Sequence, residues 1–323
     1  MELKRHSNLT KIKELLHFKE SGILLALIIM SALLSITTPN FLNQYNLGIV
    51  VRQASFVALV ALGQTLVLIT GGIDLSVGSI AGLSSILGAI LMTSTPLNPY
   101  LCTLLAVLCG MFFGIINGVF IAKIGLNPFI VTLATGEAFA GLILVITKGY
   151  PVLGIPTSFK YLGQGMIGPV PVPVVILLII SLILIYILKN TPFGRYIYSI
   201  GGNESASKLV GIKVDKIKIS VYAIAGALAA LAGIIFVSRA NAGQATIGAS
   251  WLMPSVTAAI IGGTSLSGGE GTILGTLIGA ILMGVLSNGI VLLNVSSYLE
   301  RVIIGLVVLV AVIIDLVRKR NRS

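Results

Sequence analysis

Three acidic residues lie inside or beside the apolar segments of this sequence, and they are the side chains best placed to do chemistry. Asp74 follows two glycines in GGIDLSVGS, Glu137 lies in the middle of PFIVTLATGEAFAGLILVIT, and Glu270 precedes a later apolar segment. Carboxylates in such positions carry protons or ions, line polar paths or form buried pairs. A proton or ion relay needs several acids or histidines within mutual reach, so three scattered acids support gradient coupling poorly.

The remaining reactive side chains offer little for bond chemistry or metal binding. Both histidines, His6 and His17, lie in the polar N-terminal tail. Cys102 and Cys109 fall in one apolar segment, about two helical turns apart, which is too far for a disulfide. The sequence has no Gly-x-x-x-x-Gly-Lys-Ser/Thr phosphate-binding loop. We therefore predict no catalytic residue, no metal site and no cofactor on this chain. If ATP drives the protein, ATP and Mg²⁺ bind to a separate chain.

The composition indicates what kind of secondary structure holds these acidic residues in place. The chain has 323 residues, of which 56% are hydrophobic and 10% charged, and its mean hydropathy is +1.06. Soluble domains carry about 25% charged residues. A membrane-spanning helix needs about 20 apolar residues, and the apolar segments supply about ten such helices. We therefore predict an all-α integral membrane protein with about ten transmembrane helices.

The positions of the basic residues indicate the membrane topology. The chain has a net charge of +11, and its Lys and Arg residues gather at the ends of the apolar segments. We predict a cytoplasmic tail over residues 1–20, one transmembrane domain over 21–317 with a cytoplasmic loop over 190–216, and a basic cytoplasmic C-terminus over 318–323. This arrangement places 16 of the 21 Lys and Arg residues on the cytoplasmic side, as the positive-inside rule requires. The charge is thus explained without nucleic acid.

Two stretches of the chain are related by an internal repeat. Placing residue n over residue n + 191 aligns 71–92 with 262–283, and 11 of the 22 pairs are identical. Internal repeats and broken helices are typical of transporters. The double glycines Gly71-Gly72 and Gly262-Gly263 interrupt helices, and irregular backbone at membrane depth is tolerated only inside protein or beside a water-filled cavity. We therefore predict broken helices at both pairs, with the relative orientation of the two copies left open.

Polar residues within the apolar segments mark a candidate translocation path. Burying an acid at the centre of a bilayer costs about 2.5–3.5 kcal/mol, so Glu137 is not expected to face lipid. The alternative is structural: Glu137 pairs with Arg52 or Arg239, or is protonated and bonded to a backbone carbonyl. The candidate path residues are Gln64, Asp74, Asn117, Thr132, Thr135, Glu137 and Asn288.

The predicted cytoplasmic loop carries the signals of a short helix. It reads NTPFGRYIYSIGGNESASKLVGIKVDKIK. Asn203 suits an N-cap, Glu204 the positive helix end, and Gly211 a left-handed stop about seven residues later. A helix this short is marginal alone. We therefore predict a docking helix that presents apolar residues to a partner; the alternative is a solvated basic loop that only sets topology.

Several motifs together resemble one family. ALGQTLVLITGGIDLSVGS, GLNPFIVTLAT, the loop sequence above and GGTSLSGGEGT look like the permease subunit of ribose-type monosaccharide ABC importers. The resemblance runs from about residue 40 to the end of the sequence. It implies a permease domain in the bacterial cytoplasmic (inner) membrane that pairs with a second permease subunit, identical or paralogous. It also implies a cytoplasmic ABC ATPase carrying ATP and Mg²⁺, and an extracytoplasmic sugar-binding protein.

In such a permease the loop helix would be the coupling helix that receives the motion of the ATPase. The implied coupling residues are Asn203, Glu204, Ser205, Ala206, Lys208, Leu209, Val210, Gly211 and Ile212. The stretch resembles the EAA-type signature of ABC permeases, but four residues separate Ala206 from Gly211 where that signature has three. Individual ATPase contacts are therefore not transferred.

The resemblance implies import of ribose or a similar pentose, with specificity held mainly by the binding protein. Within the same class, another sugar or the furanosyl signal autoinducer-2 is an alternative substrate. In another class, a gradient-driven secondary transporter would use Asp74 or Glu137 as its coupling site. A membrane-embedded enzyme is disfavoured because no nucleophile, base and metal cluster is present.

Overall fold

The computed structural model describes residues 20–320, apart from the side chains at 297–298 and 314–320. The predicted cytoplasmic tail, except for Glu20, lies outside the described residues, as do residues 321–323 of the predicted basic C-terminus.

Among the described residues, seven helices are long and apolar enough to cross a membrane. They are α3 (Gln44–Ile69), α4 (Val77–Ser94), α5 (Pro99–Ala122), α6 (Pro128–Thr147), α8 (Val172–Asn190), α11 (Val214–Ala240) and α13 (Ile273–Leu292). Two shorter apolar helices are α2 (Ser21–Thr37) and α12 (Leu252–Ile261), and the last helix is α14 (Ser297–Arg320). A helical membrane protein is confirmed, whereas the count of about ten spans is not.

The connections contain smaller elements that the sequence did not predict. Between α6 and α8 lie η1 (Thr157–Phe159), α7 (Lys160–Gln164), β1 (Met166–Ile167) and β2 (Val170–Pro171). The two strands form an antiparallel hairpin in which Met166 lies opposite Pro171. The prediction of an all-α protein therefore needs one correction. α7 ends at Gln164 and is followed by Gly165, and the turn residue Gly168 adopts φ +59°, which allows the chain to reverse.

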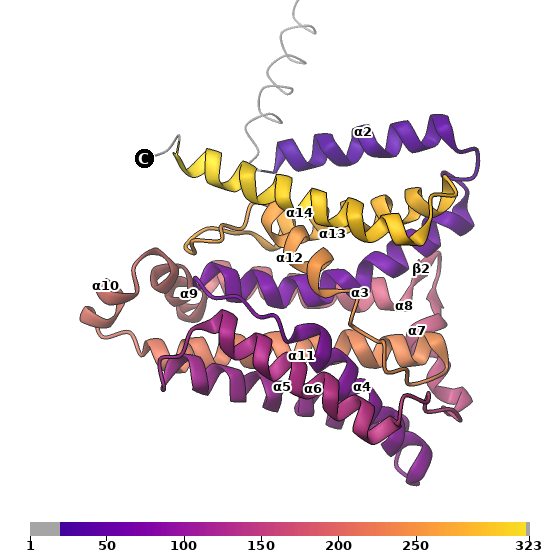
Figure 1. Ribbon diagram of the computed structural model, residues 1–323, viewed down its shortest axis with the longest axis horizontal. Coiled ribbons are helices and arrows are strands. Elements are labelled where there is room, and N and C mark those ends of the chain that lie inside the picture. Colours follow the sequence, from indigo (N-terminus) through magenta and orange to yellow (C-terminus); the bar gives the residue numbers. More distant parts are fainter. Residues whose placement is uncertain (1–19, 321–323) are drawn as a thin grey trace, which may run out of the picture.

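The long helices run roughly alongside one another (Figure 1). The short helices α9 (Pro192–Gly202) and α10 (Glu204–Leu209) project from one end of the bundle, at the left of the view. The start of α2 and the end of α14 lie toward the same end, whereas β1, β2 and α7 lie at the opposite end (Figure 1). The bundle thus has two distinct ends.

The core of the bundle forms around α3 and α11. Each has buried residues on all sides, including Leu62 and Leu66 on α3 and Ile234 on α11, all at most 1% exposed. α11 packs mainly against α5, α3 and α4. The α5–α11 approach depends on glycine, since a Cβ at Gly114 would lie 2.1 Å from the Tyr222 carbonyl oxygen. Close backbone packing of this kind is typical of membrane helices.

Candidate functional site

The first double glycine separates α3 from α4 with an irregular segment around Asp74. α3 ends at Ile69 and α4 begins at Val77. Gly71 adopts φ +77°, which reverses the chain. Asp74 is fully buried, and its Oδ1 accepts hydrogen bonds from the Ser76 backbone N–H at 2.8 Å and from Ser76 Oγ at 2.6 Å. This carboxylate organises the start of α4.

Two further predicted path residues join the same cluster. The Gln64 side-chain amide donates to the Asp74 carbonyl oxygen. Asn117 Nδ2 donates to Ser76 Oγ at 2.8 Å, which ties α5 to the irregular segment. Gln64 Oε1, Asp74 Oδ2 and Asn117 Oδ1 are buried oxygens without a hydrogen-bond partner among the described residues. Gln64, Asp74, Ser76 and Asn117 thus form a buried polar cluster inside the bundle.

The hydrogen bonds of the other predicted path residues go to partners outside this cluster. Thr132 and Thr135 donate to carbonyls of their own helix, Pro128 at 2.7 Å and Val131 at 3.0 Å. Asn288 exchanges hydrogen bonds with Asn46 at 2.8 and 3.0 Å, which links α13 to α3. Among the described residues, hydrogen bonds thus unite Gln64, Asp74 and Asn117 of the predicted path residues, and α6 packs against this cluster where Gly136 meets Ser76.

Glu137 differs from all of these because its side chain is exposed on the outside of the chain. Arg52 and Arg239, the two alternative partners of Glu137, do not form an ion pair with it. Arg52 Nη2 lies 3.3 Å from the Met166 sulfur, and the Arg239 guanidinium lies over the rings of Phe56 and Phe236 at 5.7 and 5.9 Å. Glu204, by contrast, forms ion pairs with Lys208 and Lys218.

The second double glycine lies between α12 and α13. α12 ends at Ile261, Gly263 adopts φ +92°, and α13 begins at Ile273. The connection reaches the first break directly, because the Gly269 backbone N–H donates to the Ile69 carbonyl at 2.9 Å. α9 joins this contact, since a Cβ at Gly201 would lie 1.8 Å from the Ile69 oxygen and 2.4 Å from the Gly269 nitrogen. We call this contact of Ile69, Gly201 and Gly269 the glycine junction.

A short helix, α10, forms at the position that the capping pattern indicates. The Asn203 side chain accepts from the Ala206 N–H at 2.9 Å, and Gly211 has φ +83°. Glu204 pairs with Lys208 at 2.8 Å and with Lys218 of α11 at 2.5 Å. Hydrogen bonds from Lys208 and then Lys218 hold the pKa of Glu204 below its usual value.

α10 exposes apolar surface at its end. Leu209 is 88% exposed and Val210 is 75% exposed, although large apolar side chains normally avoid water. Ser207 Oγ lies 2.8 Å from Ser199 Oγ, and so α10 is fastened to α9 on its other side. The helix is thus held in place with its apolar end outward.

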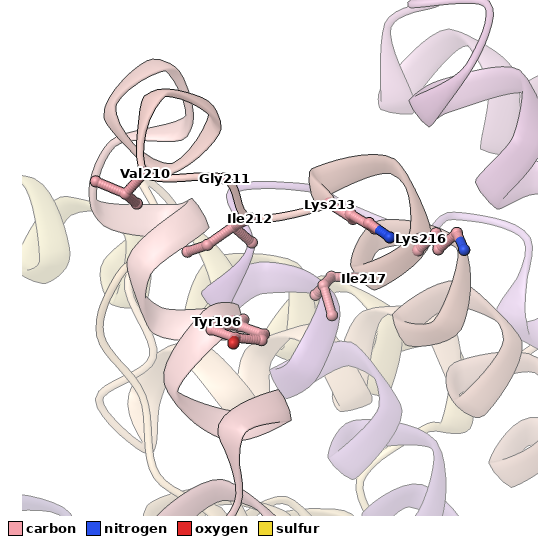
Figure 2. Close-up of a pocket in the computed structure, with 7 residues that line it drawn as sticks. All are labelled: Tyr196, Val210, Gly211, Ile212, Lys213, Lys216 and Ile217. Atoms are coloured by element: carbon pink, nitrogen blue, oxygen red, sulfur yellow. The ribbon is translucent and has the colours of Figure 1, made fainter.

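The helix α9 was missed by the sequence analysis, which treated this stretch as loop. The signal was present: Thr191 Oγ1 accepts from the Gly194 N–H at 3.3 Å, and Pro192 occupies the first turn. Ile197 and Ile200 bury one face of α9. A pocket of about 480 Å³ lies between α9 and the α10–α11 connection (Figure 2). It is lined by Tyr196, Val210, Gly211, Ile212, Lys213, Lys216 and Ile217.

These features are those of a helical membrane protein with a projecting helical loop, in which both double glycines lie in connections between helices. Residues 46–312 match the family described as branched-chain amino acid transport system / permease component. The chain belongs to this permease family. It is a permease subunit of the ABC importer class and not an enzyme.

Three relatives show the range of the family. The ribose import permease protein of Bacillus subtilis is 44% identical over 93% of both chains. The L-arabinose ABC transporter permease protein of Azospirillum brasilense is 32% identical over 94% of this chain and 89% of its own. The autoinducer 2 import system permease protein of Photorhabdus laumondii is 33% identical over 92% and 89%. No solved structure matches the chain.

Proposed function

We propose that this chain is the membrane permease of an ATP-driven importer for ribose or a similar pentose. The observation that carries the choice of substrate is the 44% identity to a ribose import permease along 93% of both chains. The permeases named for L-arabinose and autoinducer 2 are 32% and 33% identical, and these compounds are the competing substrates to test.

The energy source in this proposal is a separate ATPase that binds ATP and Mg²⁺ and docks on α10. Two observations support the docking: the exposed apolar side chains of Leu209 and Val210, and the ion pairs that fix Glu204 to Lys208 and Lys218. A fixed short helix with an apolar end can transmit a push, whereas an unsupported one frays. The proposed coupling surface comprises Asn203, Glu204, Ser205, Ala206, Lys208, Leu209, Val210, Gly211 and Ile212.

The topology in this proposal has ten membrane crossings. α2 packs against α13, and α12 packs against α3, α13 and α14, which supports counting α2, α12 and α14 with the seven longer spans. The described termini and the α9–α10 loop then share one side, the cytoplasmic face of the inner membrane. Lys123, Lys189 and Lys213 follow or precede spans on that side, as the positive-inside rule favours.

Two further partners complete the proposed importer. A second permease subunit, identical or paralogous, packs beside this one in the bilayer. An extracytoplasmic binding protein delivers the sugar to the end that carries β1, β2 and α7. The domain limits in this proposal are a tail over 1–20, the permease domain over 21–317 and a basic end over 318–323.

Reconstitution tests the function directly. The chain is purified in mild detergent with its co-purifying subunits, which are identified by mass spectrometry, and then placed in liposomes. We expect an ATP-binding subunit to co-purify and ribose uptake to require ATP and a binding protein. Competition by unlabelled arabinose and autoinducer-2 ranks the substrates. Uptake by the chain alone, driven by a proton or sodium gradient, would overturn the proposal.

Gly211→Val tests the coupling helix. Gly211 has φ +83° and open space around its Cα, so valine strains the backbone without a steric clash. We expect about tenfold less ATPase bound, with membrane insertion unchanged. Gly202→Val is the matched control, because this glycine also faces open space but has no positive φ. Equal ATPase recovery from both variants would contradict the docking role of α10.

A further inference from the structure

Three buried oxygen atoms of the polar cluster have no hydrogen-bond donor among the described residues. They are Gln64 Oε1, Asp74 Oδ2 and Asn117 Oδ1. All three side chains are 0% exposed. A buried oxygen without a partner is costly, and most buried polar groups in proteins have one. Three such oxygens in one cluster indicate that a ligand supplies the missing contacts.

The hydrogen bonds of the cluster fix which atom of each amide is free. The Asp74 backbone carbonyl oxygen only accepts, so the nitrogen of the Gln64 amide must face it. The Ser76 hydroxyl gives its one hydrogen to Asp74 Oδ1 at 2.6 Å, so Ser76 Oγ must accept from the Asn117 nitrogen at 2.8 Å. Reversal of either amide would bring two acceptors together. The free atom of both amides is therefore the oxygen.

The hydrogen-bond donors of Ser76 and Tyr222 are already engaged. The Ser76 backbone N–H donates to Asp74 Oδ1 at 2.8 Å, the same oxygen that binds the Ser76 hydroxyl. The Tyr222 hydroxyl donates to the Ile73 carbonyl oxygen at 3.2 Å. One oxygen of the Asp74 carboxylate thus orders the start of α4, and the other oxygen is left for a different partner.

The charge of Asp74 is not balanced by a basic side chain. No lysine or arginine among the described residues forms an ion pair with Asp74, whereas Glu204 pairs with Lys208 and Lys218. The positive end of α4 favours the ionised carboxylate, but a helix end carries only about half an elementary charge. Buried charges are normally paired or bound to a metal ion. A ligand with one positive charge would complete the cluster.

We propose that the buried polar cluster binds one monovalent alkali cation through Gln64 Oε1, Asp74 Oδ2 and Asn117 Oδ1. Carboxylate and carbonyl oxygens are the ligands that hard cations prefer. One positive charge neutralises the single carboxylate, whereas a divalent ion would leave a net charge buried. The site was not expected from the sequence, where histidines and cysteines were considered as ligands and amides were not.

The ion joins three separate parts of the bundle. Gln64 lies on α3, Asn117 lies on α5, and Asp74 lies in the connection that leads into α4. Because the three side chains are 0% exposed, the ion is a resident ligand that stabilises the fold and not a coupling ion moved across the membrane. The inference goes beyond the proposed import function and does not depend on it.

Thermal unfolding in different salts tests the site. The full chain, with the subunits that co-purify, is kept in detergent at constant ionic strength while choline chloride is replaced by NaCl or KCl. A ligand that binds only the folded state raises Tm as its concentration grows. We expect Tm to rise by about 3 °C between about 1 and about 100 mM of the preferred alkali cation. Choline alone should give no rise.

Asp74→Asn locates the bound ion. Asparagine keeps an oxygen for the Ser76 hydrogen bonds but removes the charge, so the Tm of this variant should no longer respond to Na⁺ or K⁺. Asn288→Ala is the matched control, because it breaks a buried amide pair with Asn46 of α3 and leaves the polar cluster intact. Its Tm should be lower in choline and should still rise with the alkali cation as in the wild type.

Equilibrium binding of radioactive sodium and rubidium, the latter in place of K⁺, makes the outcome decisive. We expect the wild-type chain to bind a single ion, and Asn117→Ala, which keeps the carboxylate, to bind it at least about tenfold more weakly because one ligand is lost. Three results would overturn the inference: no ion bound to the wild type, an equal cation response in Asp74→Asn, or a Tm that follows pH and not the cation. None of these results bears on the import proposal, which reconstitution tests separately.

Discussion

The two copies of the internal repeat share a sequence pattern and differ in shape. In the first copy, Gly71 has φ +77° and Gly72 is packed, with its Cβ position 2.6 Å from the Tyr222 hydroxyl. In the second copy the roles are exchanged: the Cβ position of Gly262 lies 2.5 Å from the Gly275 backbone, and Gly263 has φ +92°. The chain reverses one residue later in the second copy.

The next helix also starts at different aligned positions. α4 begins at Val77, whereas its counterpart Gly268 lies in the connection before α13, with φ +84°. Asp74 explains the difference, because its carboxylate binds Ser76 and so starts α4 early. The aligned Ser265 instead donates its backbone N–H to the Glu270 carbonyl at 3.0 Å. A repeat in sequence thus specifies where a helix stops, and the local polar partners decide where the next one starts.

The largest effect is expected from removing the polar side chain at the aligned positions of the two copies, Asp74 and Ser265. Asp74→Ala leaves the buried Ser76 N–H and hydroxyl without an acceptor, and each unsatisfied group costs about 1–3 kcal/mol. We expect a large fall in thermal stability, measured as Tm in detergent. Ser265→Ala loses one 3.2 Å contact from the Ser267 N–H and should cost less than about 1 kcal/mol. Equal shifts in Tm would refute the role given to Asp74.

Substitution of the two glycines in the second copy is expected to have a smaller effect on Tm. Gly262→Ala drives a methyl group against the Gly275 backbone at 2.5 Å, which requires α12 and α13 to separate. Gly263→Ala meets open space and costs only the left-handed backbone strain, about 1–2 kcal/mol. We expect Gly262→Ala to lower Tm and transport more than Gly263→Ala. The reverse order would mean that the turn lies one residue away from its described position.

The smallest expected effect is the pH dependence of the Glu204 ion pairs, which lie outside both copies of the repeat. Neighbouring lysines hold the folded-state pKa of Glu204 below its unfolded value, so its ion pairs stabilise α10 at neutral pH. This stability is present above the unfolded pKa and is lost as the pH falls below about 4.5 through the folded pKa. The side chain is 39% exposed, so the contribution is below about 1 kcal/mol.

Proteolysis of the α9–α10 loop measures this effect as the pH is lowered from 7 to well below 4.5. Glu204→Gln should raise the cleavage rate at pH 7 and abolish its increase on acidification. Asp215→Asn is the control, because Asp215 lies on the same end of the molecule and is exposed. A pH dependence that persists in Glu204→Gln would assign it to another group.

Local signals allowed parts of this structure to be predicted from sequence. Asn203, Glu204 and Gly211 indicated α10 because capping depends on residues within one turn. α9, which was not predicted, carried a similar capping signal in Thr191 and Pro192. The prediction relied on apolar periodicity, which does not register capping residues. Helix ends at the double glycines were readable for the same local reason, because α3 ends at Ile69 and α12 at Ile261.

Long-range contacts explain what the sequence could not supply. Asn117 meets Ser76 only because α5 packs beside the first break, and no spacing in the sequence encodes that contact. Asn288 had an equally suitable side chain but pairs with Asn46. The number of spans could not be predicted from segment length, because α12, from Leu252 to Ile261, is shorter than a membrane-spanning helix.

The glycine junction links events at the two ends of the repeat. At Gly201 there is no room for a side chain between α9 and the Ile69 carbonyl, and Ile69 is itself bonded to Gly269. The three backbones therefore form one joint with almost no free play. We therefore expect a displacement of α9 to move the end of α3 and the connection before α13 together, so that both copies of the repeat would respond to one mechanical input.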